Sequence, residues 1–202
     1  MPSFLNRMVL LLPLLGAAVG AAENADFPKE ARGRVIAADF VQTRRLAELE
    51  MEVRITGSMV SELDGRLRWQ VDAPVRSVTV IDREKLTHYD GETKKLSVIR
   101  QEAFPWLGIL RESLDDWLSG DKARLAQRFQ VSAPRPRTVL LVPRESARRK
   151  LFRSVELEFS EKEDFITMIR IAESSGDRLE IRFSQLRRDP PLPQDLWRMP
   201  PR

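Results

Sequence analysis

Apolar and polar residues alternate one by one over much of this sequence from about residue 40 onward. In segment 51–59, Met51, Val53, Ile55 and Met59 fall on one side, and charged or small residues fall between them. A period of two residues is typical of a β-strand with one buried face. Comparable short or longer apolar segments lie at 66–71, 78–80, 86–89, 96–98, 129–131, 139–141, 155–159, 165–171 and 179–183. The chain is therefore predicted to fold mainly as β-sheet.

Glycine-containing turns join several of these segments. Leu63-Asp64-Gly65-Arg66, Asp90-Gly91 and Ser175-Gly176-Asp177 each stand between two alternating runs, which predicts hairpins and an antiparallel sheet. Two stretches depart from the pattern. Asp26 to about Ala38 is predicted to begin as a short helix, and a clear amphipathic helix is predicted where Trp106, Leu110, Leu114 and Trp117 recur at helical spacing before Gly120.

One good helix cannot cover the apolar faces of about ten strands, so the sheet is expected to cover itself by curling. The predicted fold class is mainly β: an incomplete antiparallel β-barrel, that is, a curved half-barrel sheet with a few helices forming a lid. Its apolar interior is either filled by side chains or available to a ligand.

The N-terminus has the features of an export signal. Arg7 precedes an apolar run, and the small residues Gly20-Ala21-Ala22 precede Glu23, which predicts a signal peptide at 1–22 and a single domain at 23–202. The alternative is an uncleaved membrane anchor, although the apolar run is short for one. The sequence contains no cysteine, which excludes both a disulfide and lipidation of an N-terminal cysteine.

Charge and residue types also limit the chemistry. A net charge of +4 is too small to indicate nucleic-acid binding. His88 is the single histidine and is expected to be structural, and no spacing typical of a metal site is present. Asp115 and Asp116 are adjacent and are expected on a solvated helix face. Neither an enzyme nor a cofactor is predicted, although carboxylates that meet only in space stay possible.

A basic segment has two interpretations of equal weight. Arg144, Arg148, Arg149 and Lys150 form its centre, with Glu145 as the acid among them. The segment is either a docking patch for an acidic partner or anionic headgroups, or a solvated strand edge where cations discourage aggregation.

Several short motifs follow one another along the chain. They are, in order, Phe40-x-Gln42, Gly57, Leu67-Arg68-Trp69, Pro74, Tyr89-Asp90, the Trp/Leu helix and the ending Leu196-Trp197-Arg198-Met199-Pro200-Pro201. Their shared order resembles that of the LolA outer-membrane lipoprotein carriers, and the resemblance extends over nearly all of residues 23–202.

This resemblance implies a soluble periplasmic carrier that binds acyl chains of lipoproteins or related lipids in an apolar cavity. It implies an inner-membrane ABC-type lipoprotein-release transporter as donor, an outer-membrane acceptor, and no cofactor. Leu63 stands where the better-known members have an arginine that latches the lid, and their extra C-terminal strand is not expected here. The lid latch is therefore expected to differ.

The predicted ligand-binding residues are the apolar strand residues expected to point inward and the apolar face of the lid helix. They are Met51, Val53, Ile55, Met59, Leu67, Trp69, Val78, Val80, Trp106, Leu110, Leu114 and Trp117. The alternative for each is ordinary core packing. The alternative function is a periplasmic sensor of lipid or lipoprotein that regulates an envelope stress response, which the length of the chain disfavours. A monomer is expected.

Overall fold

The computed structural model describes residues 35–62, 66–82, 84–100, 126–144, 146–150, 152–161 and 165–200, without the side chains of residues 147 and 148. Eleven strands, the helical turn α4 (Ser146–Arg149) and a short helical segment at 126–128 are present in these ranges. The strands are β1 (Val35–Leu46), β2 (Met51–Glu62), β3 (Arg66–Ala73), β4 (Ser77–Ile81), β5 (Lys85–Asp90), β6 (Lys95–Arg100), β7 (Phe129–Arg135), β8 (Thr138–Pro143), β9 (Phe152–Phe159), β10 (Ile166–Glu173) and β11 (Arg178–Arg188).

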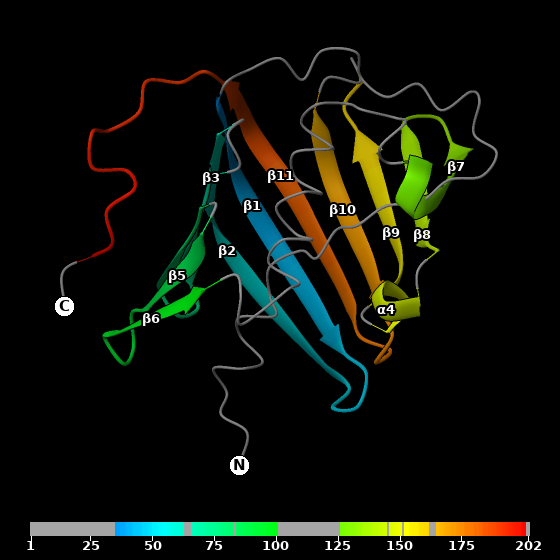
Figure 1. The fold of residues 1–202 in the computed structure, drawn as a ribbon, viewed down its shortest axis with the longest axis horizontal. Coiled ribbons are helices and arrows are strands. Elements are labelled where there is room, and N and C mark those ends of the chain that lie inside the picture. The colour runs from blue at the N-terminus through cyan, green and yellow to red at the C-terminus, as the bar shows by residue number, and fades with distance from the viewer. Residues whose placement is uncertain are drawn as a thin grey trace.

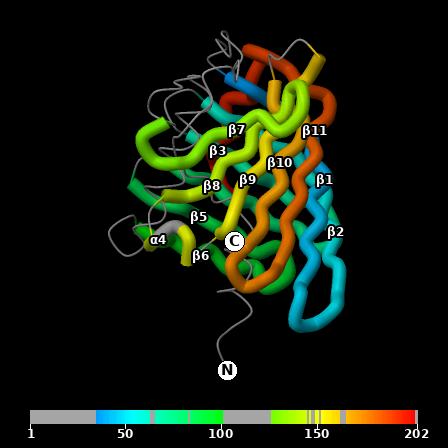
Figure 2. Tube along the Cα trace, turned by 90° about the vertical axis from the view of Figure 1, so that its right-hand side faces the viewer, coloured from blue at the N-terminus to red at the C-terminus, as the bar shows by residue number. Residues whose placement is uncertain are grey.

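All eleven strands belong to one antiparallel sheet in the order β6-β5-β4-β3-β2-β1-β11-β10-β9-β8-β7. The first and last strands of the chain, β1 and β11, pair in the middle of the sheet (Figure 1). In the rotated view of Figure 2 the two ends of the sheet lie on the side away from β1, β2, β10 and β11, so the sheet is U-shaped in section. Strands β6 and β7 are its edges in the described part, and the sheet is not closed. The mainly-β, open antiparallel prediction is confirmed.

The strand register sorts side chains onto two faces. Residues directly opposite each other share a face, so Ala38, Met59, Trp69, Thr79 and His88 form one row across β1 to β5. This face carries the main core, whose members come from β1–β5 and from β7–β11. They are Phe40, Ile55, Leu67, Trp69, Ile81, Leu86, Phe129, Val131, Val139, Leu141, Phe152, Val155, Leu157, Phe159, Ile169, Ile171, Leu179 and Ile181. It is the concave face of the sheet.

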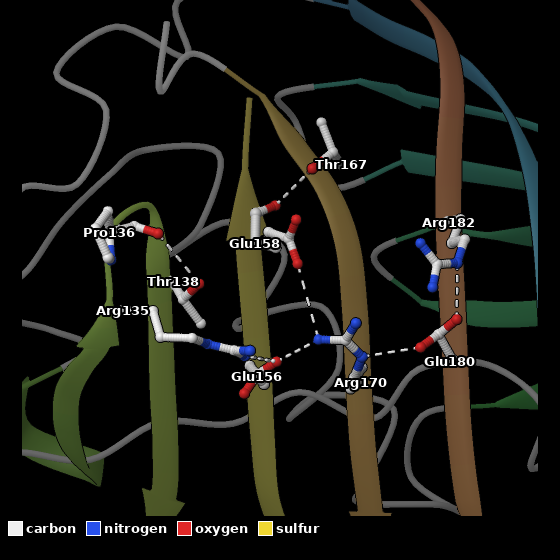
Figure 3. A network of polar contacts seen from close by, with 9 residues as sticks. All are labelled: Arg135, Pro136, Thr138, Glu156, Glu158, Thr167, Arg170, Glu180 and Arg182. Carbon is white, nitrogen blue, oxygen red and sulfur yellow. Dashed lines mark hydrogen bonds and ion pairs between the residues drawn. The ribbon is translucent and has the colours of Figure 1, made fainter. Parts of the chain in front are cut away.

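The outer face of β8–β11 carries charges instead (Figure 3). Arg170 lies between Glu156 and Glu180 and donates a 2.8 Å hydrogen bond from Nε to Glu180. Burial alone would lower the pKa of Arg170, but its hydrogen bonds to Glu180 and Glu156 raise that pKa above the ordinary value. Strands of the first half, drawn in teal, lie behind β8–β11 in this view. Two apolar side chains share this outer face with the charges, since Leu140 lies opposite Glu156 and Met168 lies between Glu158 and Arg182.

The outer face of β3–β5 is covered by the C-terminal tail. Val78, Val80 and Tyr89 form a small second core there, against which Trp197 and Met199 pack. Arg68 donates hydrogen bonds to the carbonyl oxygens of Leu196 (2.7 Å) and Arg198 (3.2 Å). Figure 1 shows the tail passing β3 and β5 on the outside of the sheet.

The predicted short helix at 26–38 is wrong where the structure describes it. Residues 35–38 belong to β1 and are not helical, because they pair with β2 from Val35↔Glu62 onward. Their burial on both sides obscures the alternation that would otherwise have marked a strand. The remainder of that predicted short helix, the signal peptide, and the lid helix around Trp106–Gly120 lie outside the described residues.

Gly57 sits where no larger residue fits. It lies between Phe40 and Val71 on the concave face, beside a shift in the β2–β3 register. A Cβ at this position would collide with the backbone carbonyl of Gln70 and would come within 2.8 Å of Phe40 Cζ. The Phe40 ring in turn stacks on Trp69, so the absence of a side chain at Gly57 permits the packing of both rings.

Replacing Gly57 by alanine is expected to lower the free energy of unfolding by about 1–3 kcal/mol, the usual cost of forced overpacking. Urea unfolding measures this. Ser58→Ala, one residue along on the outer face, is the control and is expected to change stability by less than about 0.5 kcal/mol. Equal stability of the two variants would show that the β2–β3 backbone yields at Gly57.

Candidate functional site

The centre of the concave face is aromatic. The rings of Phe40 and Trp69 are stacked with centroids 3.9 Å apart, and Phe183 meets Trp69 edge-on at 6.4 Å. These three side chains come from β1, β3 and β11, so they join strands from the two termini of the chain. Offset-stacked and edge-on rings pack more favourably than their buried area alone implies.

Some apolar side chains of this face are only partly buried. Val53, Met59, Val71, Ile99, Ile166 and Phe183 pack against the main core without being enclosed by it. Met59 and Val71 are the β2 and β3 members nearest the stacked rings in register, and Phe183 completes the aromatic group. These six side chains form the partly exposed apolar surface of the concave face.

The structure places most of the predicted strand residues on this face. Ile55, Leu67 and Trp69 belong to the main core, and Val53 and Met59 pack against it. Met51 is in register with the same face, opposite Leu46, but its side chain is 45% exposed at the end of the β1–β2 hairpin.

Val78 and Val80 were predicted to point inward, and that prediction is wrong. They lie on the outer face under the tail, with Arg68 and Gln70 as their β3 partners. Thr79 and Ile81 occupy the concave face instead, opposite Trp69 and Leu67. Every residue of β4 is buried, so alternation cannot show which face is which. The tail that buries the valines is distant in sequence, and local pattern gives no sign of it.

The predicted lid residues Trp106, Leu110, Leu114 and Trp117 lie outside the described residues, as does Leu63. Among the described strands, the predicted set omitted the second half of the concave face. Phe129, Val131, Leu141, Val155, Leu157, Ile169, Ile171, Leu179 and Ile181 are all buried there. Their alternation was visible in the sequence. The pairing of β11 with β1, which puts both halves on one face, is a long-range contact that no local signal reveals.

Several polar side chains interrupt the apolar concave face. His88 is 4% exposed, and its Nδ1 lies 2.8 Å from the hydroxyl oxygen of Thr79. Burial lowers the pKa of His88, and the negative charge of Asp90 offsets only part of that effect. The Asp90 carboxylate accepts hydrogen bonds from the backbone N–H groups of Thr93 and Glu92. The hydrogen bond from Thr93 is the main reason why the pKa of Asp90 is lowered.

A charged cluster closes the same face at the hairpin ends. Arg44 donates hydrogen bonds from its Nη2 to Glu173 (2.8 Å) and Asp177 (3.0 Å), linking β1 to the β10–β11 turn. Asp177 also accepts a hydrogen bond from the backbone N–H of Ala47. Burial raises the pKa of Glu173, although Arg44 opposes this. Gly176, with φ of +97°, makes the turn that presents Asp177.

The predicted docking residues lie around α4. The side chains of Arg144, Arg149 and Lys150 are exposed, and Arg144 donates a 3.3 Å hydrogen bond from Nε to the carbonyl of Phe129. The backbone carbonyl of Arg149 accepts a hydrogen bond from the hydroxyl of Ser174. The Arg148 side chain is outside the description.

No group of three or more His, Cys, Asp and Glu side chains in the described part of the chain is arranged to hold a metal ion. Over the same ranges, no helix combines the length and apolar character needed to cross a bilayer.

Comparison with known proteins gives one family over most of the chain. The family model described as outer membrane lipoprotein carrier protein LolA matches residues 32–200. The outer-membrane lipoprotein carrier protein of Legionella pneumophila strain Lens is 26% identical over 202 residues, which cover 98% of this chain and 96% of that protein. The outer-membrane lipoprotein carrier protein of Dechloromonas aromatica is 28% identical over 195 residues, which cover 95% of this chain and 88% of that protein.

Solved structures share the fold at low identity. An uncharacterized conserved protein from Thermus thermophilus superimposes with a TM-score of 0.51 at 14% identity, covering 86% of this chain and 90% of that chain. A chain from the MucA/MucB complex of Pseudomonas aeruginosa gives 0.50 at 14% identity, covering 86% of this chain and 58% of that chain. These similarities establish the fold alone.

The buried His88 predicts a specific pH dependence of stability. Because burial lowers the pKa of His88 in the folded state, the unfolded chain binds a proton more readily. The free energy of unfolding should therefore fall as pH drops below about 6.5, the ordinary histidine value, towards the folded-state pKa. Thermal unfolding from about pH 7.5 to about pH 5.5 should show a smaller loss of stability in His88→Phe than in the parent protein.

His88 is the single histidine of the sequence, so the difference between the two proteins isolates its titration. Identical pH dependence in both would show that His88 binds protons equally well in the folded and unfolded states.

Proposed function

This chain belongs to the LolA family of outer membrane lipoprotein carrier proteins, and from that premise we propose that its concave apolar face holds the acyl chains of its cargo. The family match extends over all eleven strands. The protein is an outer-membrane lipoprotein carrier, a transport protein and not an enzyme.

The observation that carries the proposal is the continuity of the apolar concave face across an open sheet. One core joins residues from β1 to β5 with residues from β7 to β11, while the edge strands β6 and β7 do not pair with each other in the described part. An open sheet can change its curvature without breaking a ladder of hydrogen bonds, whereas a closed barrel cannot. Such a face can separate its side chains to admit a flexible chain.

The energetics suit an acyl ligand. Each methylene removed from water contributes about 0.8 kcal/mol, so a cargo with two or three acyl chains needs extensive apolar contact. The partly exposed apolar side chains Val53, Met59, Val71, Ile99, Ile166 and Phe183 are the proposed first contacts. Met59 is well suited, because an unbranched thioether side chain adapts to chains of variable shape. Ile55, Leu67 and Trp69 would form the floor beneath the cargo.

The proposed transport route is the one that the family implies. LolA carriers are periplasmic, and the proposal includes export by a cleaved signal peptide at 1–22, with residues 23–202 as a single domain acting as a monomer. An inner-membrane ABC-type transporter would load the cargo, and an outer-membrane acceptor would receive it. A lipid sensor with the same fold would also bind acylated cargo, but it would not pass that cargo to an acceptor.

The basic residues around α4 are the proposed docking surface for a partner. Arg144, Arg149 and Lys150 are exposed, and α4 lies at the end of the second half of the sheet (Figure 1). Exposed cations here would steer an acidic surface towards the carrier, an interaction that salt weakens.

Replacing Met59 by glutamine tests the cargo face. The change keeps the length of the side chain but makes it polar, and a diacylated lipopeptide should bind about tenfold more weakly, which corresponds to about 1.4 kcal/mol. Displacement of a fluorescent fatty-acyl probe measures the affinity. Val60→Gln is the matched control, because Val60 is the next residue of β2, is also partly buried and faces outward.

Equal weakening in both variants would argue against the concave face as the site. Failure of the parent protein to bind any acylated probe would contradict acyl binding by the carrier itself.

Reversing charge at Arg149 and Lys150 tests the docking surface. The double change to glutamate should slow ATP-dependent release of a lipoprotein from inner-membrane vesicles several-fold at low salt, with the difference shrinking as salt screens the charges. Lys94→Glu with Lys95→Glu is the control, since these exposed lysines lie in the β5–β6 hairpin at the other end of the sheet. The same salt-dependent loss in the control would mean that net charge, and not this surface, governs release.

A further inference from the structure

Gln42 lies in the middle of β1 with its side chain on the concave face. Its direct neighbours across the sheet are Ile55 of β2 and Ile181 of β11, both apolar and buried. Gln42 is 1% exposed and is among the largest fully buried side chains. Neither Nε2 nor Oε1 of its amide has a hydrogen-bond partner among the described residues, and neither atom reaches the surface.

An unpartnered amide in an apolar setting is unfavourable. A buried donor or acceptor without a partner costs about 1–3 kcal/mol, and this side chain has two such atoms. Leucine or methionine at this position would avoid the cost entirely. Gln70 on the outer face provides the contrast, because its Oε1 accepts a hydrogen bond from Arg68 and its Nε2 donates to Asp72. The fold therefore does satisfy a glutamine amide elsewhere.

The position of Gln42 is a boundary. Two residues before it, Phe40 begins the aromatic centre of the concave face. Two residues after it, Arg44 begins the charged cluster with Glu173 and Asp177. An acylated molecule has the same succession of chemical groups: a hydrocarbon chain, a carbonyl linkage and then a polar head.

We propose that the Gln42 amide binds the carbonyl linkage, ester or amide, that joins an acyl chain to the cargo. The inference rests on the proposed function, because it assumes that acyl chains lie on this face. The Nε2–H group donates to the carbonyl oxygen of either linkage. Oε1 additionally accepts from the N–H of an N-acyl amide, which an ester lacks. Hydrogen bonding to cargo recovers the cost that the free protein bears.

Among the described residues, His88 is another buried side chain of this face with an unpartnered atom, its Nε2. Its ring nevertheless has one partner, Thr79, and it lies on β5, in the row of Trp69 and Met59. Gln42 has two unpartnered atoms and stands where the apolar face meets the charged cluster. The geometry therefore favours Gln42 as the group that meets the linkage.

The test compares lipids that differ only in the linkage. The probes are a dipalmitoyl glycerol derivative with a fluorescent headgroup, its dihexadecyl ether counterpart, and an N-palmitoyl amide with the same headgroup. The parent protein should bind the ester about tenfold more tightly than the ether, as expected for one hydrogen bond in a dry site. Gln42→Met should bind the ester as weakly as the ether, while Gln70→Met retains the preference. The amide probe shows which linkage loses more affinity in Gln42→Met, and so which is the main ligand.

A stability measurement accompanies the binding assay. Because it removes an unpartnered amide, Gln42→Met should raise the thermal unfolding midpoint of the ligand-free protein, which a residue selected for packing would not do. Gln42→Leu is the second variant, should the methionine protein fail to fold. Equal binding of ester, amide and ether by the parent protein overturns this inference alone, as does a preference that survives in the Gln42 variants. Failure of the parent protein to bind any of the three overturns the proposed function, and this inference with it.

Discussion

The pairing of β1 with β11 is the contact on which the rest of this structure depends. It joins the first and last strands of the chain in the middle of the sheet, and it puts the apolar sides of both halves on one face. Because side chains alternate along a strand, a slip of one residue here would turn one half of the core towards water. Asp189 and Val35 fix the end of this pair, since the N–H of Asp189 donates to the Val35 carbonyl and the N–H of Val35 donates to the Asp189 carboxylate. Arg44 ties the opposite end to the β10–β11 turn.

The two halves of the sheet are supported differently. Strands β3 to β5 are covered on both faces, by the core inside and by the tail residues Trp197 and Met199 outside. Strands β8 to β11 have a core on one face and a charged network on the other, in which Glu156, Arg170 and Glu180 are linked. The first half is therefore held by packing on both sides, while the outer side of the second half carries partly exposed charged side chains. Trp197 and Met199, from the motif at the end of the chain, cover the outer face of β4, which gives the apolar residues of an otherwise proline-rich tail a structural role.

Sequence alone indicated much of this fold, for an identifiable reason. Segments 51–59, 66–71 and 179–183 each have one more exposed and one buried face. Their alternation therefore predicted strands and correctly placed Ile55, Leu67 and Trp69 on the inner face. The same reasoning failed at Val78 and Val80, because both faces of β4 are buried. The outer face of β4 is buried by the tail, which is distant in sequence. Sequence alternation also could not single out Gln42. The residue is part of the Phe40-x-Gln42 motif, but the lack of a hydrogen-bond partner for its amide is a property of three-dimensional packing.

A carrier must release what it binds, and a concave face that already packs against itself provides for release. If every methylene of two long acyl chains passed from water to a preformed dry pocket, the gain of about 0.8 kcal/mol each would make the complex nearly irreversible. Here most of the concave face is already buried by its own side chains, with Phe129, Leu141, Val155, Leu157 and Ile181 close to fully enclosed. Cargo bound as proposed would replace protein–protein contacts as it enters, and the net gain would be the smaller difference between two packed states. Polar atoms left without partners inside the same face add to affinity only for a ligand that can bond to them. Weak net apolar binding and selective polar binding together would let such a surface hold acylated cargo in water and still release it.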